Sequence, residues 1–442
     1  MHARAETVAA PYGPVAKRAA LWLLFLAPFF YLTYGAANWL ASLRDDVGSI
    51  VFDWERAVPF MAWTIVPYWS INLFYALSLF VNDTKSGVDR LAGRYLTAQI
   101  VAVSCFLAFP LAATFVRPET TGLPGFMFAV LGGFDKPFNQ APSLHIALLV
   151  IIWDHLSCRL SGPAKIVWHG WCLLIGASVL TTWQHHFIDI PTGVLLGLFA
   201  LWLFPRAGTL PFAGFVLTAD PWTRRLGAYY AGAAALLLAA AVIGTLASAV
   251  WLVLLWPALA LAIVAFGYFG AGAKIFQKAD DGTVSLASRL LLAPYRLAAR
   301  INAWAWTRRL PARVEIADGV FLGRFPGSGE YGDYGSVVDL AAEFEKPFGP
   351  TPTWTSIAVM DLVSPSTPDL ERATQAIEAA QTRGTVLVCC ALGFQRSAGA
   401  VAHWLVSTGR AKDWTAAEAM LRNAGRPVHL SPPLIAAKEP AE

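Results

Sequence analysis

The residues with the clearest capacity for chemistry lie between Cys390 and Ser397, near the end of the chain. An apolar, strand-like TVLV precedes two cysteines, and a helix-like SAGAVAHWLVSTG begins at Ser397. A loop between a strand and a helix start directs backbone N–H groups at an anion, so it can bind a phosphate dianion and favour a thiolate at Cys390. Gly393 permits a tight backbone course, Arg396 can hold two phosphate oxygens in a fork, and Ser397 can hydrogen-bond the departing thiolate. This pattern predicts a thiol that attacks phosphorus.

Three further residues, His145, His185 and Asp189, place ionisable side chains inside or beside apolar segments. Burying such groups is costly, so they are functional candidates by default. One histidine can attack phosphorus while a second protonates the leaving oxygen, and an aspartate can orient one imidazole and stabilise its cation. His185 and Asp189 are four residues apart at an expected helix start, where they can face each other. The set predicts a second site for phosphate chemistry.

The cysteine group resembles the Cys-x5-Arg loop of the protein tyrosine phosphatase superfamily, in particular the dual-specificity phosphatases, whose loop reads C-x-x-G-x-x-R-S. The resemblance covers residues 317–435 and implies a phosphocysteine at Cys390, with the phosphate held by Arg396. It also implies an upstream general-acid aspartate after a strand, which is Asp361, with Asp369 as a nearby alternative. The residue before the nucleophile is usually His but is Cys389 here. Cys389 either forms a protective disulfide or has no role.

The histidine group resembles the type 2 phosphatidic acid phosphatase superfamily, over residues 95–205. The three motifs of that family are K-x6-R-P, P-S-G-H and S-R-x5-H-x3-D, and this chain reads PLAATFVRP, PSLH and SVLTTWQHHFID. The resemblance implies that His185 is the nucleophile, Asp189 its partner and His145 the general acid. It also implies phosphate-binding positions at Arg117 and Ser143.

Two cations of these motifs are missing, because Pro110 and Val179 stand where Lys and Arg belong. The PSLH and HHFID forms look more like the branch that includes inositol phosphorylceramide synthases, which move a phosphoryl headgroup between lipids. The membrane half is therefore expected to be a lipid phosphatase, a headgroup phosphotransferase or an inactive anchor.

Composition places both groups in a membrane protein. Of 442 residues, 56% are hydrophobic and 14% are charged, and the mean hydropathy is +0.52, outside the range of soluble proteins. The formal net charge of +4 is too small to indicate a nucleic-acid partner. Five cysteines without paired spacing argue for reduced thiols, against a disulfide framework or a zinc site. The N-terminal segment lacks a signal-peptide cleavage site, so the first apolar run is expected to remain as a span.

Eight apolar runs have about the length that crosses a bilayer. They cover residues 19–40, 59–81, 95–116, 143–160, 165–184, 187–205, 226–247 and 249–271. The N-terminal segment and the second, fourth and sixth loops are richer in Lys and Arg than the loops between them, which predicts a cytoplasmic N-terminus. An even number of spans then also places the chain after residue 272 in the cytoplasm, and the histidine group at the outer surface.

The chain changes character twice after residue 272. Residues 283–313 mix Leu, Tyr and Trp with arginines, and Pro294 is an expected break. This basic amphipathic pattern predicts a helix in the headgroup region, with a solvated linker helix as the alternative. From residue 317 short apolar strands alternate with polar helices, which indicates an α/β domain. The expected parts are a polytopic membrane domain at 1–272, a linker at 273–316 and a dual-specificity phosphatase-like domain at 317–442.

These expectations describe a polytopic all-α membrane domain joined to a C-terminal α/β cysteine-phosphatase domain. The arrangement resembles bacterial fusions of a type 2 phosphatidic acid phosphatase domain with a dual-specificity phosphatase, which implies a protein of a bacterial inner membrane. The expected substrate is a membrane phospholipid that carries a phosphate monoester, with phosphotyrosine protein as the alternative. The mechanism requires no metal or other cofactor, because backbone dipoles and Arg396 stabilise charge at one site and histidines do so at the other. The sequence leaves the oligomeric state open.

Overall fold

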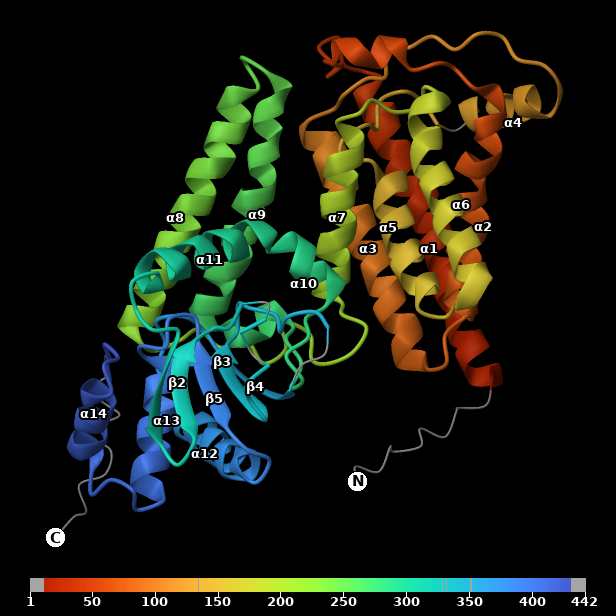
Figure 1. Cartoon of the computed structure of the whole chain (residues 1–442). Coiled ribbons are helices and arrows are strands. Elements are labelled where there is room, and N and C mark those ends of the chain that lie inside the picture. The colour runs from red at the N-terminus through yellow and green to blue at the C-terminus, as the bar shows by residue number, and fades with distance from the viewer. Residues whose placement is uncertain (1–11, 134, 328, 331, 350–351, 431–442) are drawn as a thin grey trace. The chain divides into compact units, whose positions relative to one another are not determined.

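The computed structural model describes residues 12–133, 135–327, 329–330, 332–349 and 352–430 (Figure 1). The chain divides into two compact units, Met1–Leu210 and Pro211–Glu442. The last two long apolar helices fall in the second of these units, and the domain boundary expected at residue 272 stays a prediction.

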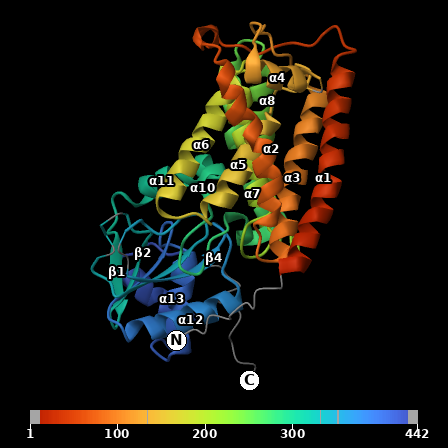
Figure 2. The same ribbon diagram turned by 90° about the vertical axis from the view of Figure 1, so that its right-hand side faces the viewer.

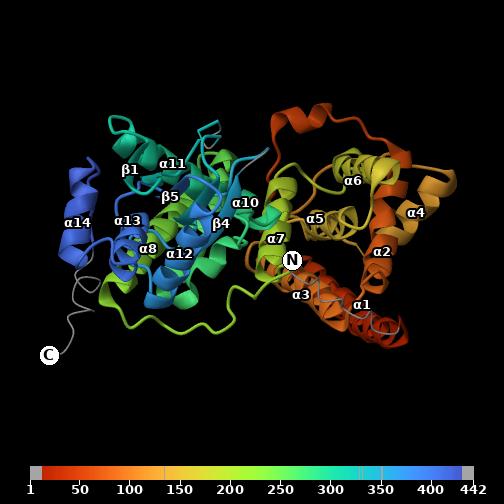
Figure 3. The same cartoon turned by 60° about the horizontal axis from the view of Figure 1, so that its bottom comes forward.

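The first unit is a bundle of apolar helices. Its helices are α1 (Tyr12–Ala41), α2 (Ile65–Phe80), α3 (Lys85–Ala108), α4 (Gly122–Gly132), α5 (Leu144–Ser157), α6 (Gly162–Thr181) and α7 (Asp189–Leu203). Figures 1 and 2 show all of these except α4 running side by side, and Figure 3 shows them closer to end-on. The turns η1 (Asp53–Ala57) and η2 (Ala62–Thr64) lie between α1 and α2.

The starts of α5 and α7 lie beside each other for reasons that can be read in the residues. Ser143 caps α5, since its Oγ accepts from Ile146 N at 3.2 Å. Two glycines one turn apart let α7 lie close against α5. A Cβ added at Gly193 would stand 2.6 Å from Ser143 O, and one at Gly197 would stand 2.9 Å from Ala147 O. Small residues at this spacing permit a close helix–helix approach in apolar surroundings.

The second unit begins with a helical hairpin. Its arms are α8 (Pro221–Gly244) and α9 (Leu255–Phe266), joined through η3 (Ala249–Leu254), and the chain continues through η4 (Gly267–Ala271) and η5 (Gly272–Phe276). Two helices follow, α10 (Leu286–Leu291) and α11 (Ala293–Thr307). Pro294 lies in the first turn of α11, so the break between α10 and α11 falls where the sequence predicts it.

A five-stranded sheet forms the α/β part of this unit. Its strands are β1 (Arg313–Ala317), β2 (Val320–Arg324), β3 (Ser336–Ala341), β4 (Thr353–Val359) and β5 (Val386–Cys390), in the order β1-β2-β5-β3-β4. β1 is antiparallel to β2, and the other pairs are parallel. The helices are α12 (Thr367–Gln381), α13 (Arg396–Ser407) and α14 (Trp414–Asn423). The main core lies between one face of the sheet and these helices, and includes Val338, Ile377 and Trp404.

The parallel strands end at one edge of the sheet, where polar loops follow them. β5 ends at Cys390, the loop after β4 carries Asp361, and the loop after β3 carries Glu343. Because the carboxyl ends of parallel strands meet at one edge, the sheet brings residues far apart in sequence to one place.

The expected number of eight membrane spans is not confirmed. Among the described residues, five helices are long and apolar enough to cross a membrane: Gly13–Ala41, Lys85–Ala108, Gly162–Thr181, Pro221–Gly244 and Ala249–Phe276. Helices also occupy the other three predicted runs, but α2, α5 and α7 contain only 16, 14 and 15 residues, fewer than the roughly 20 that a bilayer requires. Those runs are longer in sequence because residues outside the helices extend them, mainly before the start of α2 and after the end of α5.

Candidate active site

Cys390 ends β5 with its side chain buried beside the start of α13. Gly393 N donates a hydrogen bond to Cys390 Sγ at 3.3 Å, and Ser397 Oγ donates at 3.2 Å. α13 begins at Arg396, so the positive end of its dipole also lies close to the sulfur. Both donors and the helix start are thus directed at the sulfur, the atom that acts as the nucleophile in cysteine chemistry.

Gly393 is the one position of this loop where the backbone itself excludes a side chain. Its φ is +78°, in the left-handed region. A Cβ there would stand 2.5 Å from Gly323 O and 2.8 Å from Arg426 Nη2. Arg426 stabilises the loop through a hydrogen bond, since its Nη2 donates to Leu392 O. The course of the loop is therefore fixed by β2 on one side and by Arg426 on the other.

Arg396 donates hydrogen bonds to two carboxylates and one backbone carbonyl. Its Nη1 donates to Glu343 Oε2 at 2.8 Å and to Val359 O at 2.9 Å. Its Nη2 donates to Glu343 Oε1 at 2.7 Å and to Asp361 Oδ1 at 2.8 Å. Burial disfavours the guanidinium charge, but Glu343 and Asp361 outweigh that effect and hold the pKa of Arg396 well above its usual range. The bidentate pair with Glu343 orients Arg396 before any substrate binds.

Asp361 lies on the loop after β4, and its side chain is 33% exposed. Burial raises the pKa of this carboxyl, and the positive charge of Arg396 offsets the rise only in part. A carboxyl with a raised pKa keeps its proton more readily, as a general acid requires. A phosphate gripped by Arg396 would replace the Asp361 carboxylate at Nη2 and leave Asp361 free to protonate a leaving oxygen.

Two residues whose roles the sequence left open have structural positions. Asp369 Oδ2 accepts from Ser366 N at 3.2 Å and from Ser366 Oγ at 2.6 Å, which closes a capping box at the start of α12. Asp369 is thereby committed to the helix, which favours Asp361 as the acid. Cys389 packs beside Trp354 on the face of β5 opposite to Cys390. Both thiols are free, because successive strand residues point to opposite faces of a sheet.

The loop that carries Asp361 is held by the helical hairpin of the same unit. Tyr268 Oη donates to Asp361 O at 2.9 Å, and Trp222 Nε1 donates to Leu362 O at 3.3 Å. Leu362 has a φ of 56°, which residues other than glycine seldom adopt. The hairpin therefore stabilises a strained backbone directly after Asp361.

In the first unit, the histidine group gathers where α5 and α7 begin. His185 Nδ1 lies 3.0 Å from Asp189 Oδ2, and His185 Nε2 lies 3.5 Å from Ser143 Oγ. Asp189 is fully buried, and its Oδ2 also accepts from His186 N at 3.1 Å. An aspartate acceptor at Nδ1 takes the N–H there and leaves the lone pair of His185 on Nε2, the atom that faces Ser143.

His145 and Arg117 make no hydrogen bond to this pair among the described residues. The ring of His145 stacks on Tyr68 at 4.1 Å, and the guanidinium of Arg117 lies 4.9 Å from the centre of the Phe128 ring. His145 Nε2 and Arg117 Nη1 are buried without a hydrogen-bond partner, a situation that is uncommon in proteins and is found at binding sites. Within the described part of the chain, no three His, Cys, Asp or Glu side chains gather to hold a metal ion.

Sequence reasoning missed the carboxylates that orient these groups. Glu343 pairs with Arg396, and Glu55 accepts from His186 Nδ1 at 3.1 Å. A signal for Glu343 existed, because it follows a strand that ends at the same edge of the sheet as Cys390. Glu55 has no comparable signal, since it stands 131 residues before its partner in a loop between apolar segments.

Solved structures similar to part of this chain are dual-specificity and protein tyrosine phosphatases. The structure of Tk-PTP in its active form is 22% identical over 27% of this chain and 88% of its own, with a TM-score of 0.25. The structure of human DUSP28 is 23% identical over 28% of this chain and 88% of its own, with a TM-score of 0.25. No family model and no curated protein matches the chain. Similarity at this level does not assign a function, so the proposal below rests on the geometry of the site.

Proposed function

We propose that the second unit is a cysteine-dependent phosphatase that releases inorganic phosphate from a phosphate monoester. The observation that supports this most is the pair of donors on Cys390 Sγ, beside an Arg396 whose plane Glu343 fixes. The thiolate attacks phosphorus while the bond from phosphorus to the leaving oxygen breaks, and Asp361 gives its proton to that oxygen. Water then attacks the phosphocysteine and passes a proton to Asp361. Cys390 leaves as a thiolate that the hydroxyl of Ser397 stabilises.

The substrate that fits best is a lipid phosphate monoester at a membrane surface. The same unit contains two helical segments long and apolar enough to cross a membrane. The helix α11 of this unit also exposes Leu297, Ile301 and Trp304. A catalytic site tethered at a membrane meets lipid headgroups at a high effective concentration. A phosphotyrosine protein is the alternative substrate.

The proposed location is a bacterial inner membrane, with the N-terminus and the α/β part of the chain in the cytoplasm. Basic loops on one side of the eight predicted runs support this orientation, because an even number of crossings returns the chain to the side of its N-terminus. A cytoplasmic position would also keep Cys390 reduced and able to react.

The proposal is tested by phosphate release from the whole detergent-solubilised protein, with a panel of lipid phosphate monoesters and a phosphotyrosine peptide. Cys390→Ser should lower turnover by roughly a thousandfold or more, because a serine hydroxyl lacks the ionised nucleophile. The matched control is Cys389→Ser, on the opposite face of the same strand, which should stay within about threefold of the parent. Equal losses of turnover in the two variants would attribute the effect to disturbed packing of β5 and would contradict the proposal.

A second function, in the first unit, is favoured by the buried contacts of His185 with Asp189 and Ser143. We propose that His185 Nε2 attacks the phosphorus of a lipid phosphate there while the bond from phosphorus to the leaving oxygen breaks, and that His145 protonates that oxygen. Water or the hydroxyl of an acceptor lipid then attacks the phosphohistidine, gives up its proton to His145 and releases His185, so the product is either free phosphate or a lipid carrying the transferred headgroup. His185→Ala should abolish that product, and His169→Ala, whose ring bonds Trp153 instead, should not. If His185→Ala leaves every product unchanged, the first unit is an anchor.

A further inference from the structure

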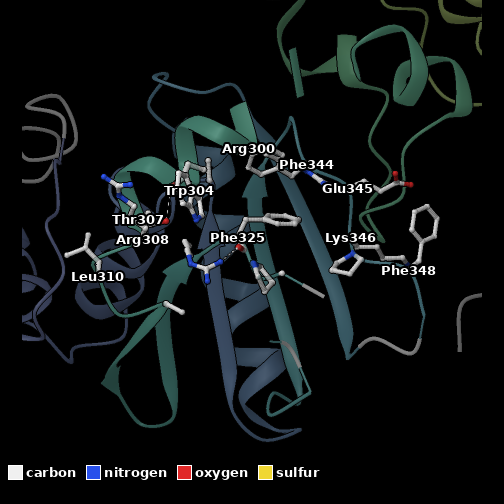
Figure 4. A pocket seen from close by; sticks show the side chains of 17 residues that line it. Arg300, Trp304, Thr307, Arg308, Leu310, Phe325, Phe344, Glu345, Lys346 and Phe348 are labelled. Atoms are coloured by element: carbon white, nitrogen blue, oxygen red, sulfur yellow. Dashed lines mark hydrogen bonds between the residues drawn. The ribbon is translucent and has the colours of Figure 1, made fainter. Parts of the chain in front are cut away.

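A cavity of about 530 Å³ lies next to the loop that follows Cys390. One wall is α11 with the residue that follows it, which contribute Arg300, Trp304 and Arg308. The other wall comes from the end of β2 and the loops after β2 and β3, with Phe325 and Lys346 (Figure 4) and with Arg324. We refer to this cavity as the arginine pocket.

The arginine pocket adjoins the candidate phosphate loop directly. Ala391, the residue after Cys390, lines the pocket, and its carbonyl accepts from Phe325 N at 3.4 Å. The small side chains of Ala299 and Ala303 on α11 pack against a cluster that includes Ala391. A ligand whose terminal phosphate reached Cys390 would therefore pass the wall of this pocket.

The charge of the pocket is positive, and two of its cations are free to bind an anion. The guanidinium of Arg300 lies over Phe344 at 5.8 Å and that of Arg308 lies over Trp304 at 5.3 Å. Neither has a carboxylate partner among the described residues. The one acid in the wall, Glu345, is already paired with Arg289. Guanidinium groups bind phosphate oxygens in a bidentate manner, so the pocket fits a phosphate group better than a neutral one.

The apolar side of α11 indicates what carries that phosphate. Leu297, Ile301 and Trp304 follow one another at helical spacing, and 61%, 57% and 61% of their surfaces are exposed. A helix with an exposed apolar stripe and flanking arginines suits the boundary between lipid headgroups and acyl chains. Trp304 belongs to both the stripe and the pocket, so the pocket opens beside the surface that would meet lipid.

We propose that the arginine pocket binds a second phosphate group of the substrate, the phosphodiester of a glycerophospholipid whose headgroup ends in a phosphate monoester. The monoester occupies the loop at Cys390, the diester lies against Arg300 and Arg308, and the acyl chains extend past the apolar stripe of α11. This inference rests on the proposed phosphatase function and names the substrate class for it.

The test compares two short-chain lipids with the same acyl groups in mixed micelles with the whole protein. Dioctanoyl phosphatidylinositol monophosphate has a monoester and a diester, and dioctanoyl phosphatidic acid has only the monoester. In the double variant Arg300→Gln/Arg308→Gln, the ratio of kcat/KM for the first lipid to that for the second should fall about tenfold, because charge-assisted hydrogen bonds to the diester are lost. The ratio is insensitive to the fraction of folded protein. The matched control, Arg309→Gln, changes an arginine just after α11 that does not line the pocket, and should leave the ratio within twofold.

An unchanged ratio in the double variant overturns the second-phosphate site while the phosphatase function stands. An equal fall of kcat/KM for both lipids leaves the ratio unchanged and therefore also overturns it. Failure of the parent protein to hydrolyse either lipid counts instead against the phosphatase function. A third substrate, the deacylated headgroup of the first lipid, shows whether the protein prefers the intact lipid to a soluble bisphosphate. If the headgroup is hydrolysed as efficiently as the intact lipid, the role of the acyl chains is overturned.

Discussion

At Gly393 the phosphate loop has room for a hydrogen atom and for nothing larger. The backbone passes so close to Gly323 O and Arg426 that a Cβ would overlap both. The same residue donates its N–H to Cys390 Sγ. In the proposed phosphatase, its small size would let this N–H reach the sulfur, which a wider course of the loop would prevent.

Gly393→Ala tests this at the scale of one atom. We expect a loss of roughly a hundredfold in turnover, because the loop must move away from the sulfur to accommodate the methyl group. Gly409→Ala is the matched control: its φ is also positive, +75°, but a Cβ there would meet nothing within 4 Å. Both changes strain the backbone by about 1 kcal/mol, so the thermal unfolding temperature should fall in both variants. Phosphate release should fall only in Gly393→Ala. Equal losses of activity would refute the role given to the close approach.

At the scale of elements, the acid loop after β4 depends on a contact with the helical hairpin. Tyr268 Oη donates a hydrogen bond to the carbonyl of Asp361, and Trp222 Nε1 donates one to the carbonyl of Leu362. The loop thus keeps Asp361 in the partly buried position that raises the pKa of its carboxyl. In the proposed phosphatase, residues that do not touch the substrate would influence the pKa of the general acid in this way.

Tyr268→Phe should therefore change the pH dependence of the reaction. A general acid works only while protonated, so activity falls as the pH rises through the pKa of Asp361. Without the Tyr268 hydroxyl the loop loosens, water reaches the carboxyl, and its pKa drops towards its ordinary value. The high-pH limb of kcat/KM should then move to lower pH, with roughly a fivefold loss of kcat. Tyr229→Phe, on the same hairpin but bonded to Arg225, should change neither. A lower rate with an unshifted limb would indicate a purely structural role.

The secondary structure around Cys390 could be predicted from the sequence, but the residues of other elements that contact this site could not. The strand, loop and helix around Cys390 follow one another in sequence, and Pro294 marks the break before α11 through its own backbone chemistry. Glu343, Tyr268 and Trp222 reach the site only through tertiary packing, which no local pattern encodes. The predicted number of spans is not confirmed for a related reason, since hydropathy records apolar residues but not where a helix ends.

For the whole molecule, a hairpin that crossed a membrane would determine which surfaces share a side of that membrane. α8 and Ala249–Phe276 are each long enough to cross, and Leu246 in the turn between them is 90% exposed. A chain that crosses twice places its turn on the side opposite to its base. The base of this hairpin leads into α11 and the sheet.

Labelling of intact cells with a membrane-impermeant maleimide checks this placement. Leu246→Cys should be labelled from outside, whereas Arg309→Cys should be labelled only after the membrane is opened. The parent protein supplies the baseline, because Cys158 is exposed. Labelling of Arg309→Cys in intact cells would show that the α/β part lies outside and would reverse the proposed orientation.

The bond from Tyr268 to the acid loop has a mechanical consequence. Tyr268 lies within a segment of membrane-spanning length, and such helices tilt when the thickness of the bilayer does not match their apolar length. A tilt of this segment would move the Tyr268 hydroxyl relative to Asp361, which lies on the loop after β4. If the hairpin crosses the membrane, the rate of the reaction should therefore depend on the acyl-chain length of the surrounding lipids, even for a substrate dissolved in water.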